Sequence, residues 1–184
     1  HDGMTGLLNK KAGWKHMRKY FDRMDSHDEA MLMFVDIDDF KIINDTYGHT
    51  VGDFWIREVA SQLRHIYRQD DIICRYGGDE FIVLIRNTAS EQVLETTLGM
   101  FFQQLTRASE QRGQDVHCSV GVCRVAAIRI SGNRDTSRNT DGENGEDTRG
   151  GVDFGQCVKQ ADLALYETKR FNKGTFNVYN YDRS

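Results

Sequence analysis

The sequence predicts an α/β fold, an α+β sandwich in which helices flank a mixed central β-sheet. Stretches with apolar residues at helical spacing alternate along the chain with short apolar runs. The chain has 184 residues and is 39% hydrophobic, which is enough for one domain with a full core. We therefore expect a single domain over residues 1–184.

The expected elements follow from these two patterns. Helices are predicted at 9–24, around 56–67, around 94–105, and at 152–169. Strands are predicted at 31–37, 72–74, 81–85, 116–122 and 176–179. The strand at 116–122 alternates apolar and small or polar residues, so one buried face is expected. Residues 131–151 contain no apolar side chain, which predicts a flexible polar insertion.

Composition excludes several classes of function. The net charge of −4 argues against nonspecific nucleic-acid binding. No apolar run is long enough to span a bilayer, so direct membrane contact is not expected. The four cysteines (Cys74, Cys118, Cys123 and Cys157) form no C-x-x-C pair and predict buried, reduced thiols in the cytoplasm. Because Cys118 and Cys123 are an odd number of residues apart on one strand, they face opposite sides and cannot share a metal.

Two acids follow a pair of glycines between apolar runs. Gly77-Gly78 predicts a two-residue β-hairpin turn, since glycine reaches positive φ without steric cost. Such a turn lets a phosphate or metal approach Asp79 and Glu80. On a regular strand these two acids point to opposite faces, so only one would share a metal with a third acid. The alternative for such a turn taken alone is a surface hairpin with solvated acids.

A third acid ends the strand predicted at 31–37. Asp36 lies at the mouth of the sheet, where α/β proteins place ligands, and with a hairpin acid it could hold a divalent cation. Lys41 adds positive charge nearby. We predict Asp38 to be the N-cap of the short helix that follows. Asp45 is interpreted as a solvated surface acid.

Four motifs in order resemble the GGDEF family of diguanylate cyclases. They are Asp2–Asn9, Asp36–Asp53 (D-x-D-x-F-K-x-x-N-D-x-x-G-H-x-x-G-D), Gly77–Phe81 (G-G-D-E-F) and Ala161–Lys169 (A-D-x-A-L-Y-x-x-K). The resemblance covers the chain apart from the insertion at 131–151. It implies a fold like that of nucleotide cyclases and polymerase palms, with the signature on a hairpin.

The resemblance implies condensation of two GTP molecules into cyclic di-GMP and pyrophosphate by a dimer of domains. The implied metal ligands are Asp36, the Ile37 carbonyl, Asp79 and Glu80. The implied catalytic residues are Asp79 as base, Glu80 at the metal site and Lys41 at the transition state. The implied substrate-binding residues are Asn44, His49, Asp53, Gly77, Gly78, Lys169 and Lys173. An aspartate facing the N1 and N2 donors of guanine rejects adenine, which fits Asp53.

The implied cofactor is Mg²⁺, two ions per active site, with Mn²⁺ able to substitute. The implied partners are GTP, cyclic di-GMP as product and inhibitor, and a second copy of the domain. Because residue 1 is His rather than Met, we expect a domain cut from a longer cytoplasmic or membrane-anchored parent with an upstream sensor. Arg68 and Asp71 form an R-x-x-D motif, which the resemblance interprets as the inhibitory product site. The alternative is a solvated ion pair at a helix end.

One departure from the family pattern concerns Asn172-Lys173-Gly174, where Gly-Arg-Asn is usual. Lys173 keeps the positive charge but loses the bidentate fork of arginine. Two alternatives to a cyclase are a noncatalytic receptor for GTP or cyclic di-GMP and a purine cyclase acting within one nucleotide. The first would lack signature acids and the second would lack the R-x-x-D and G-G-D-E-F motifs. All are present, which favours the diguanylate cyclase.

Overall fold

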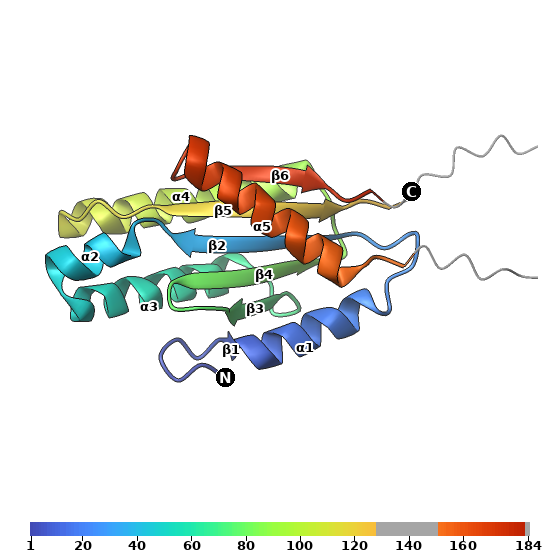
Figure 1. Ribbon diagram of the computed structural model, residues 1–184, viewed down its shortest axis with the longest axis horizontal. Helices are drawn as coiled ribbons and strands as arrows, with labels where there is room; N and C mark the ends of the chain where they lie inside the picture. Colours follow the sequence, from blue (N-terminus) through green and yellow to red (C-terminus); the bar gives the residue numbers. More distant parts are fainter. Residues whose placement is uncertain (128–150, 183–184) are drawn as a thin grey trace, which may run out of the picture.

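A six-stranded mixed sheet with the strand order β1-β3-β4-β2-β5-β6 forms the centre of the protein (Figure 1). The structure is a computed structural model that describes residues 1–127 and 151–182. Its strands are β1 (Leu8–Asn9), β2 (Ala30–Ile37), β3 (Ile72–Arg75), β4 (Glu80–Arg86), β5 (Cys118–Val125) and β6 (Phe176–Asn180). Its helices are α1 (Lys10–Phe21), α2 (Phe40–Tyr47), α3 (His49–Ile66), α4 (Glu91–Arg112) and α5 (Phe154–Phe171).

The middle of the sheet is antiparallel and its edges are parallel. Strands β3, β4, β2 and β5 pair antiparallel in that order, whereas β1 pairs parallel with β3 and β6 pairs parallel with β5. All eight residues of β2 are buried, as expected for a central strand covered on both faces. The predicted mixed sheet with flanking helices is confirmed.

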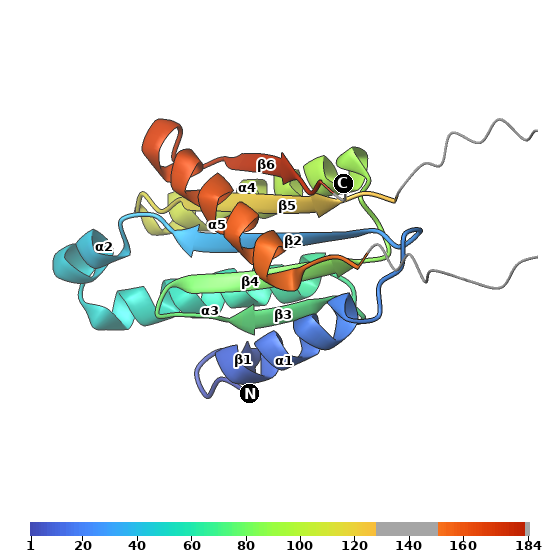
Figure 2. The same ribbon diagram turned by 45° about the vertical axis from the view of Figure 1, so that its right-hand side comes forward.

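Helices cover both faces of the sheet. Helices α1 and α5 lie on one face, and α3 and α4 lie on the other (Figures 1 and 2). Each face has its own hydrophobic core, one built around Trp55 of α3 and the other around Phe21 of α1. A Cβ on Gly121 of β5 would collide with backbone atoms of Leu165 and Ala161, so α5 packs directly on the β5 backbone. Glycine is required there by this close approach.

The structure corrects the prediction for β5. The alternation at 116–122 predicted one buried face, but seven of the eight residues of β5 are buried. The intervening Ser119 and Gly121 lie under α5 and the loop before β6, where only small side chains fit. The predicted burial of the cysteines is confirmed for all four thiols, and Cys118 and Cys123 lie in opposite core layers, as predicted.

The predicted insertion at 131–151 lies, apart from Gly151, outside the described residues, so it stays a prediction. None of the helices among the described residues is long and apolar enough to cross a membrane. One end of the sheet, at the left of Figure 1, carries the C-terminal end of β2, helix α2, the β3–β4 turn and the end of α5. The candidate site is at this end of the strands.

Candidate active site

Strand register brings three acids together at this end of the sheet. Asp36 near the end of β2 is the register partner of Glu80, the first residue of β4. The backbone N–H of Ile37 donates to the carbonyl of Asp79 at 3.2 Å, which holds the hairpin turn against the end of β2. The Lys169 ammonium, from the last turns of α5, lies 2.6 Å from Asp36 Oδ1. Four residues from three distant parts of the sequence therefore share one corner of the sheet.

The buried carboxyl of Asp36 lies between one cation and two further carboxylates in this corner. Its burial raises the pKa of Asp36 to about 6, against the opposing effect of the Lys169 ammonium. The nearby Asp79 and Glu80 carboxylates contribute to this rise in the pKa of Asp36. The Lys169 ammonium is paired with Oδ1 and so satisfies this oxygen in part. Three carboxylates beside one ammonium leave an excess of negative charge, which suits a divalent cation.

The predicted metal ligands are oxygen donors of the kind that Mg²⁺ takes. Among residues 1–127 and 151–182, no three His, Cys, Asp or Glu side chains form a ready-made metal site. The predicted set instead combines carboxylates with the Ile37 carbonyl, and Mg²⁺ usually takes one or two carboxylates plus phosphates and water. The oxygen donors at this corner are of the kind that Mg²⁺ prefers.

The signature turn differs from the predicted two-residue turn. Tyr76 and Gly77 both donate to the Glu80 carbonyl, at 2.8 and 3.2 Å, so three residues form the tip. Neither glycine has positive φ. A Cβ on Gly77 would instead collide with Glu80 Oε2, so Gly77 makes room for the carboxylate that folds back over it. The hairpin prediction is confirmed, but the conformational reason given for its glycines is wrong.

Asp79 lies in this turn rather than in β4, so strand alternation does not separate it from Glu80. Both carboxylates act electrostatically on Asp36. The choice between them as metal ligand stays a prediction.

The predicted guanine-binding residues lie on α2 and α3. Asn44 is on α2, and its amide oxygen lies against the backbone of Gly52, where a Cβ would collide with it. This places Asn44 beside the residue that precedes Asp53. Asp53 is half-exposed and lies 3.8 Å from Arg57. The Asn44 side chain thus packs on the first turns of α3, the helix that carries Asp53, while His49 and Lys41 are exposed on the same two helices.

The prediction that Asp38 caps α2 is wrong. Asp38 is buried, and its carboxylate accepts hydrogen bonds from Ser119 Oγ at 2.8 and 2.9 Å and from the N–H of Gly174 at 3.2 Å. The N-cap position belongs to Asp39, in a left-handed conformation with φ of 51° and no capping bond from its side chain. Donors from β5 and the loop before β6 satisfy the Asp38 carboxylate better than a helix end could.

Lys173 forms an ion pair with Asp39. Its ammonium donates to both carboxylate oxygens of Asp39 at 2.8 Å, which ties the loop after α5 to the loop after β2. This partner raises the pKa of Lys173, so the side chain stays charged. Its predicted phosphate contact would have to be made alongside or in place of Asp39.

The R-x-x-D motif has one structural and one exposed member. The Asp71 carboxylate accepts hydrogen bonds from the backbone N–H of Arg68 at 2.9 Å and from the backbone N–H of Arg86 at 3.0 Å. It therefore joins the end of α3 to the end of β4. The described residues show no ion pair between the Arg68 and Asp71 side chains, so the alternative of a helix-end ion pair is not observed. Arg68 borders a cavity of about 410 Å³ with Tyr67 and Gln69.

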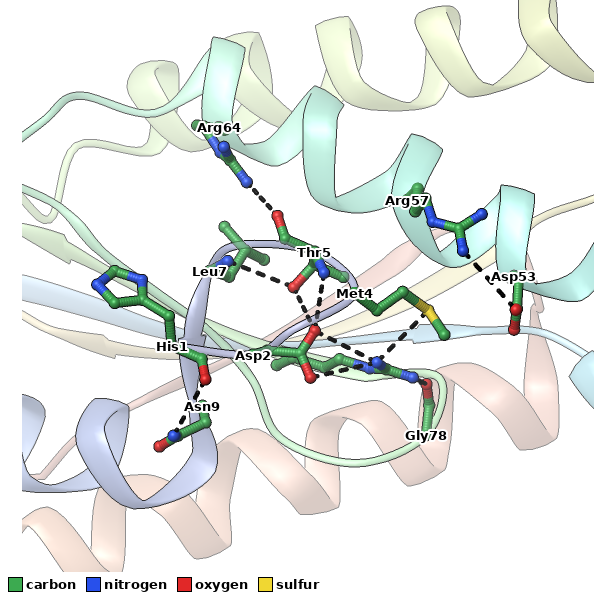
Figure 3. A network of polar contacts seen from close by, with 11 residues as sticks. His1, Asp2, Met4, Thr5, Leu7, Asn9, Asp53, Arg57, Arg64 and Gly78 are labelled. Carbon is green, nitrogen blue, oxygen red and sulfur yellow. Dashed lines mark hydrogen bonds and ion pairs between the residues drawn. The ribbon is translucent and has the colours of Figure 1, made fainter.

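Arg75 has a role that sequence reasoning missed. Its guanidinium donates twice to the Gly78 carbonyl, at 3.2 and 2.7 Å, and pairs with Asp2 at 3.3 Å. Asp2 also accepts from the N–H and hydroxyl of Thr5, whose carbonyl is bound by Arg64 of α3 (Figure 3). Arg75 thus fastens the signature turn to the N-terminal turn. An arginine two residues before the signature and an acid three residues before a threonine were the available signals.

The fold, the acid-bearing hairpin and the buried aspartate beside it define the class of protein. The sequence model of the diguanylate cyclase GGDEF domain matches residues 1–138, so the chain belongs to the GGDEF family. It is 33% identical over 179 residues to the probable diguanylate cyclase DgcC of Escherichia coli K12, covering 96% of this chain and 42% of that protein. The chain thus spans less than half the length of this relative.

Two solved structures are similar along nearly the whole chain. One is the diguanylate cyclase SiaD from Pseudomonas aeruginosa in complex with its activator SiaC, with a TM-score of 0.73 and 27% identity, covering 98% of this chain and 61% of that one. The other is the GGDEF domain of DgcB from Caulobacter crescentus in complex with c-di-GMP, with a TM-score of 0.65 and 26% identity. It covers 96% of this chain and 94% of that domain. These similarities extend past residue 138 and include α5, which carries Lys169.

Proposed function

We propose that this domain is a diguanylate cyclase that condenses two GTP molecules into cyclic di-GMP and two pyrophosphates. The observation that carries the proposal is the meeting of Asp36, Asp79, Glu80 and Lys169 at one corner in a member of the GGDEF family. An acidic corner with a lysine at its rim provides both metal-binding oxygens and a counter-charge for phosphates.

Each half-reaction is a displacement at the α-phosphorus of GTP. The 3′-hydroxyl oxygen of one GTP forms a bond to the α-phosphorus of the other, and the bond from that phosphorus to the bridging oxygen breaks. The hydroxyl proton passes to Asp79, and pyrophosphate leaves. Because each domain would hold one GTP, two domains must face one another, and the second half-reaction closes the ring.

The remaining residues bind and orient the substrate. Asn44 and Asp53, at the α2–α3 corner, would contact the guanine edge, with His49 near the same base. Lys41 would stabilise the charge that develops on the transferring phosphoryl group, and Lys169 would contact phosphates at the acidic corner. Catalysis by such a site is mainly positioning and neutralisation of charge.

The chemistry also calls for Mg²⁺ held by Asp36, the Ile37 carbonyl, Asp79 and Glu80, with Mn²⁺ as a substitute. When bound, two such ions activate the attacking oxygen and neutralise the leaving pyrophosphate. Product would inhibit at Arg68 and Asp71, where the exposed guanidinium can pair with a guanine edge or a phosphate. Lys173 would add a phosphate contact at the expense of its pairing with Asp39.

The test is to incubate the domain with GTP and Mg²⁺ over a series of protein concentrations and to resolve the nucleotides by chromatography. Cyclic di-GMP is expected, with a specific activity that rises with protein concentration because the active species is a dimer. Asp79→Ala is expected to form none. Binding of GTP without product at any protein concentration would contradict the proposal and favour the receptor alternative.

A further inference from the structure

Helix α1 and the two residues that follow it are strongly basic, although the chain as a whole is acidic. Residues 10–23 contain six lysines and arginines and one aspartate, a net charge of +5, whereas the whole chain has −4. The rest of the chain therefore has −9. Within the described part of the chain, none of the exposed cations of α1 forms an ion pair with a carboxylate: Lys10, Lys11, Lys15, Arg18 and Lys19.

The stability of α1 explains only part of this charge. Arg18 and Lys19 lie in the last turn, where cations favour the helix, but Lys10 and Lys11 occupy the first turn, which contains no acid. The N-terminus of a helix is the positive end of its dipole, where cations are unfavourable. Lys10 and Lys11 therefore cost the isolated helix stability, and an anionic ligand beside them would offset that cost.

The same cations surround an apolar groove. A cavity of about 660 Å³ is lined by Lys10, Lys11, Trp14, Lys15 and Arg18. The Trp14 ring lies 5.7 Å from the Tyr76 ring in a stacked arrangement and 4.9 Å from the Phe154 ring edge-on. The Lys10 ammonium lies 3.9 Å from the centre of the Tyr76 ring, and the Arg18 guanidinium lies 5.9 Å from that of Phe154. The groove is lined by one aromatic side chain, Trp14, which packs on Tyr76 and Phe154, and by four cations.

We propose that this α1 groove is a docking site for an acidic polypeptide segment that carries an apolar or aromatic anchor side chain. The anchor would pack on Trp14, and the flanking carboxylates would pair with Lys11, Lys15 and Arg18. None of the residues that line the groove has a role in the proposed cyclase reaction, so this binding does not depend on that activity.

Charge and shape favour a peptide over the other polyanions. A bilayer or a nucleic acid extends beyond the patch and would meet a remainder of the molecule with a charge of −9, which repels it. The apolar face of α1 (Gly13, Met17 and Phe21) is buried in the domain, so no apolar face remains for insertion into lipid. A short acidic segment contacts only the patch and can place one side chain in the groove.

Tryptophan fluorescence tests the proposal directly. Trp14 and Trp55 are the two tryptophans, and Trp55 is fully buried and bound to Gln114, so a change in emission reports on Trp14. The probe is a short peptide of glutamates with one central phenylalanine, titrated at low and high salt. Binding is expected to shift the emission and to weaken with salt. The same peptide without phenylalanine is expected to bind more weakly.

Charge reversal with a matched control separates this patch from general electrostatics. The double variant Lys11→Glu, Lys15→Glu is expected to bind the peptide at least about tenfold more weakly. The variant Arg107→Glu, Lys159→Glu makes the same change in net charge at exposed positions on α4 and α5 and is expected to bind like the wild type. Circular dichroism checks that both variants fold.

Three outcomes would overturn the proposal. They are equal binding by both double variants, peptide binding that leaves Trp14 emission unchanged, and tighter binding to phosphatidylserine vesicles or to a single-stranded oligonucleotide than to the peptide.

Discussion

Burial of Asp36 makes a prediction about stability that can be tested without any nucleotide. The pKa of this carboxyl rises from 3.8 to about 6 in the folded protein, mainly because burial disfavours its charged form. At ~1.4 kcal/mol per pKa unit, ionised Asp36 costs the fold up to about 3 kcal/mol. Relaxation of the surrounding groups reduces this to roughly 1–2 kcal/mol. Asp36→Asn is expected to stabilise the domain by that amount when no divalent cation is present.

The pH dependence follows from the direction of the shift. A carboxyl with a raised pKa binds its proton more tightly in the folded state, so folding is favoured at low pH and loses stability as pH rises from about 4 to about 6. Wild type and Asp36→Asn should therefore be nearly equal near pH 4 and differ fully at neutral pH.

The assay is thermal denaturation in EDTA across this pH range. For a domain of this size the stabilisation corresponds to an increase in Tm of roughly 3–6 °C. Asp45→Asn, which changes an exposed acid on α2, is the matched control and should leave Tm nearly unchanged. An Asp36→Asn variant that is less stable than wild type in EDTA at neutral pH would refute the reasoning. Added Mg²⁺ should then raise the Tm of wild type but not that of Asp36→Asn, because a cation that binds only the folded state stabilises it.

Three further predictions concern packing, the signature turn and the R-x-x-D motif. Gly121→Ala should cost roughly 1–3 kcal/mol in urea denaturation, because the added methyl group collides with the Leu165 backbone; an unchanged midpoint would contradict the packing described for α5. Arg75→Lys should keep the Tm within a few degrees but lower cyclase activity by at least about tenfold, because lysine cannot make both bonds to Gly78; activity equal to wild type would show that the turn needs no such support. Asp71→Asn should lower the free energy of unfolding by about 1 kcal/mol and weaken inhibition by cyclic di-GMP, and inhibition equal to that of wild type would place the product elsewhere.

Much of the fold follows from local pattern. The apolar run that forms β2 has no polar interruption before Asp36, so the sequence predicted a strand there, and all eight of its residues are buried. The helical spacing around α1 predicted its extent within three residues, because the burial of one face imposes that period. The acids of the signature were recognised as site candidates because glycines and apolar runs flank them on both sides.

The sequence by itself determined most of the elements, the hairpin and the types of side chain at the candidate site, because these depend on neighbours within a turn or a strand. Strand β1 and the first two turns of α3 were not predicted. Only the tertiary structure decided which partners those side chains have. Asp38 binds Ser119 rather than its own helix, Lys173 pairs with Asp39, and Glu80 lies beside Asp36 through strand register. Each of these contacts joins residues more than forty positions apart, where local propensity carries no information and the packing of the sheet selects the partner.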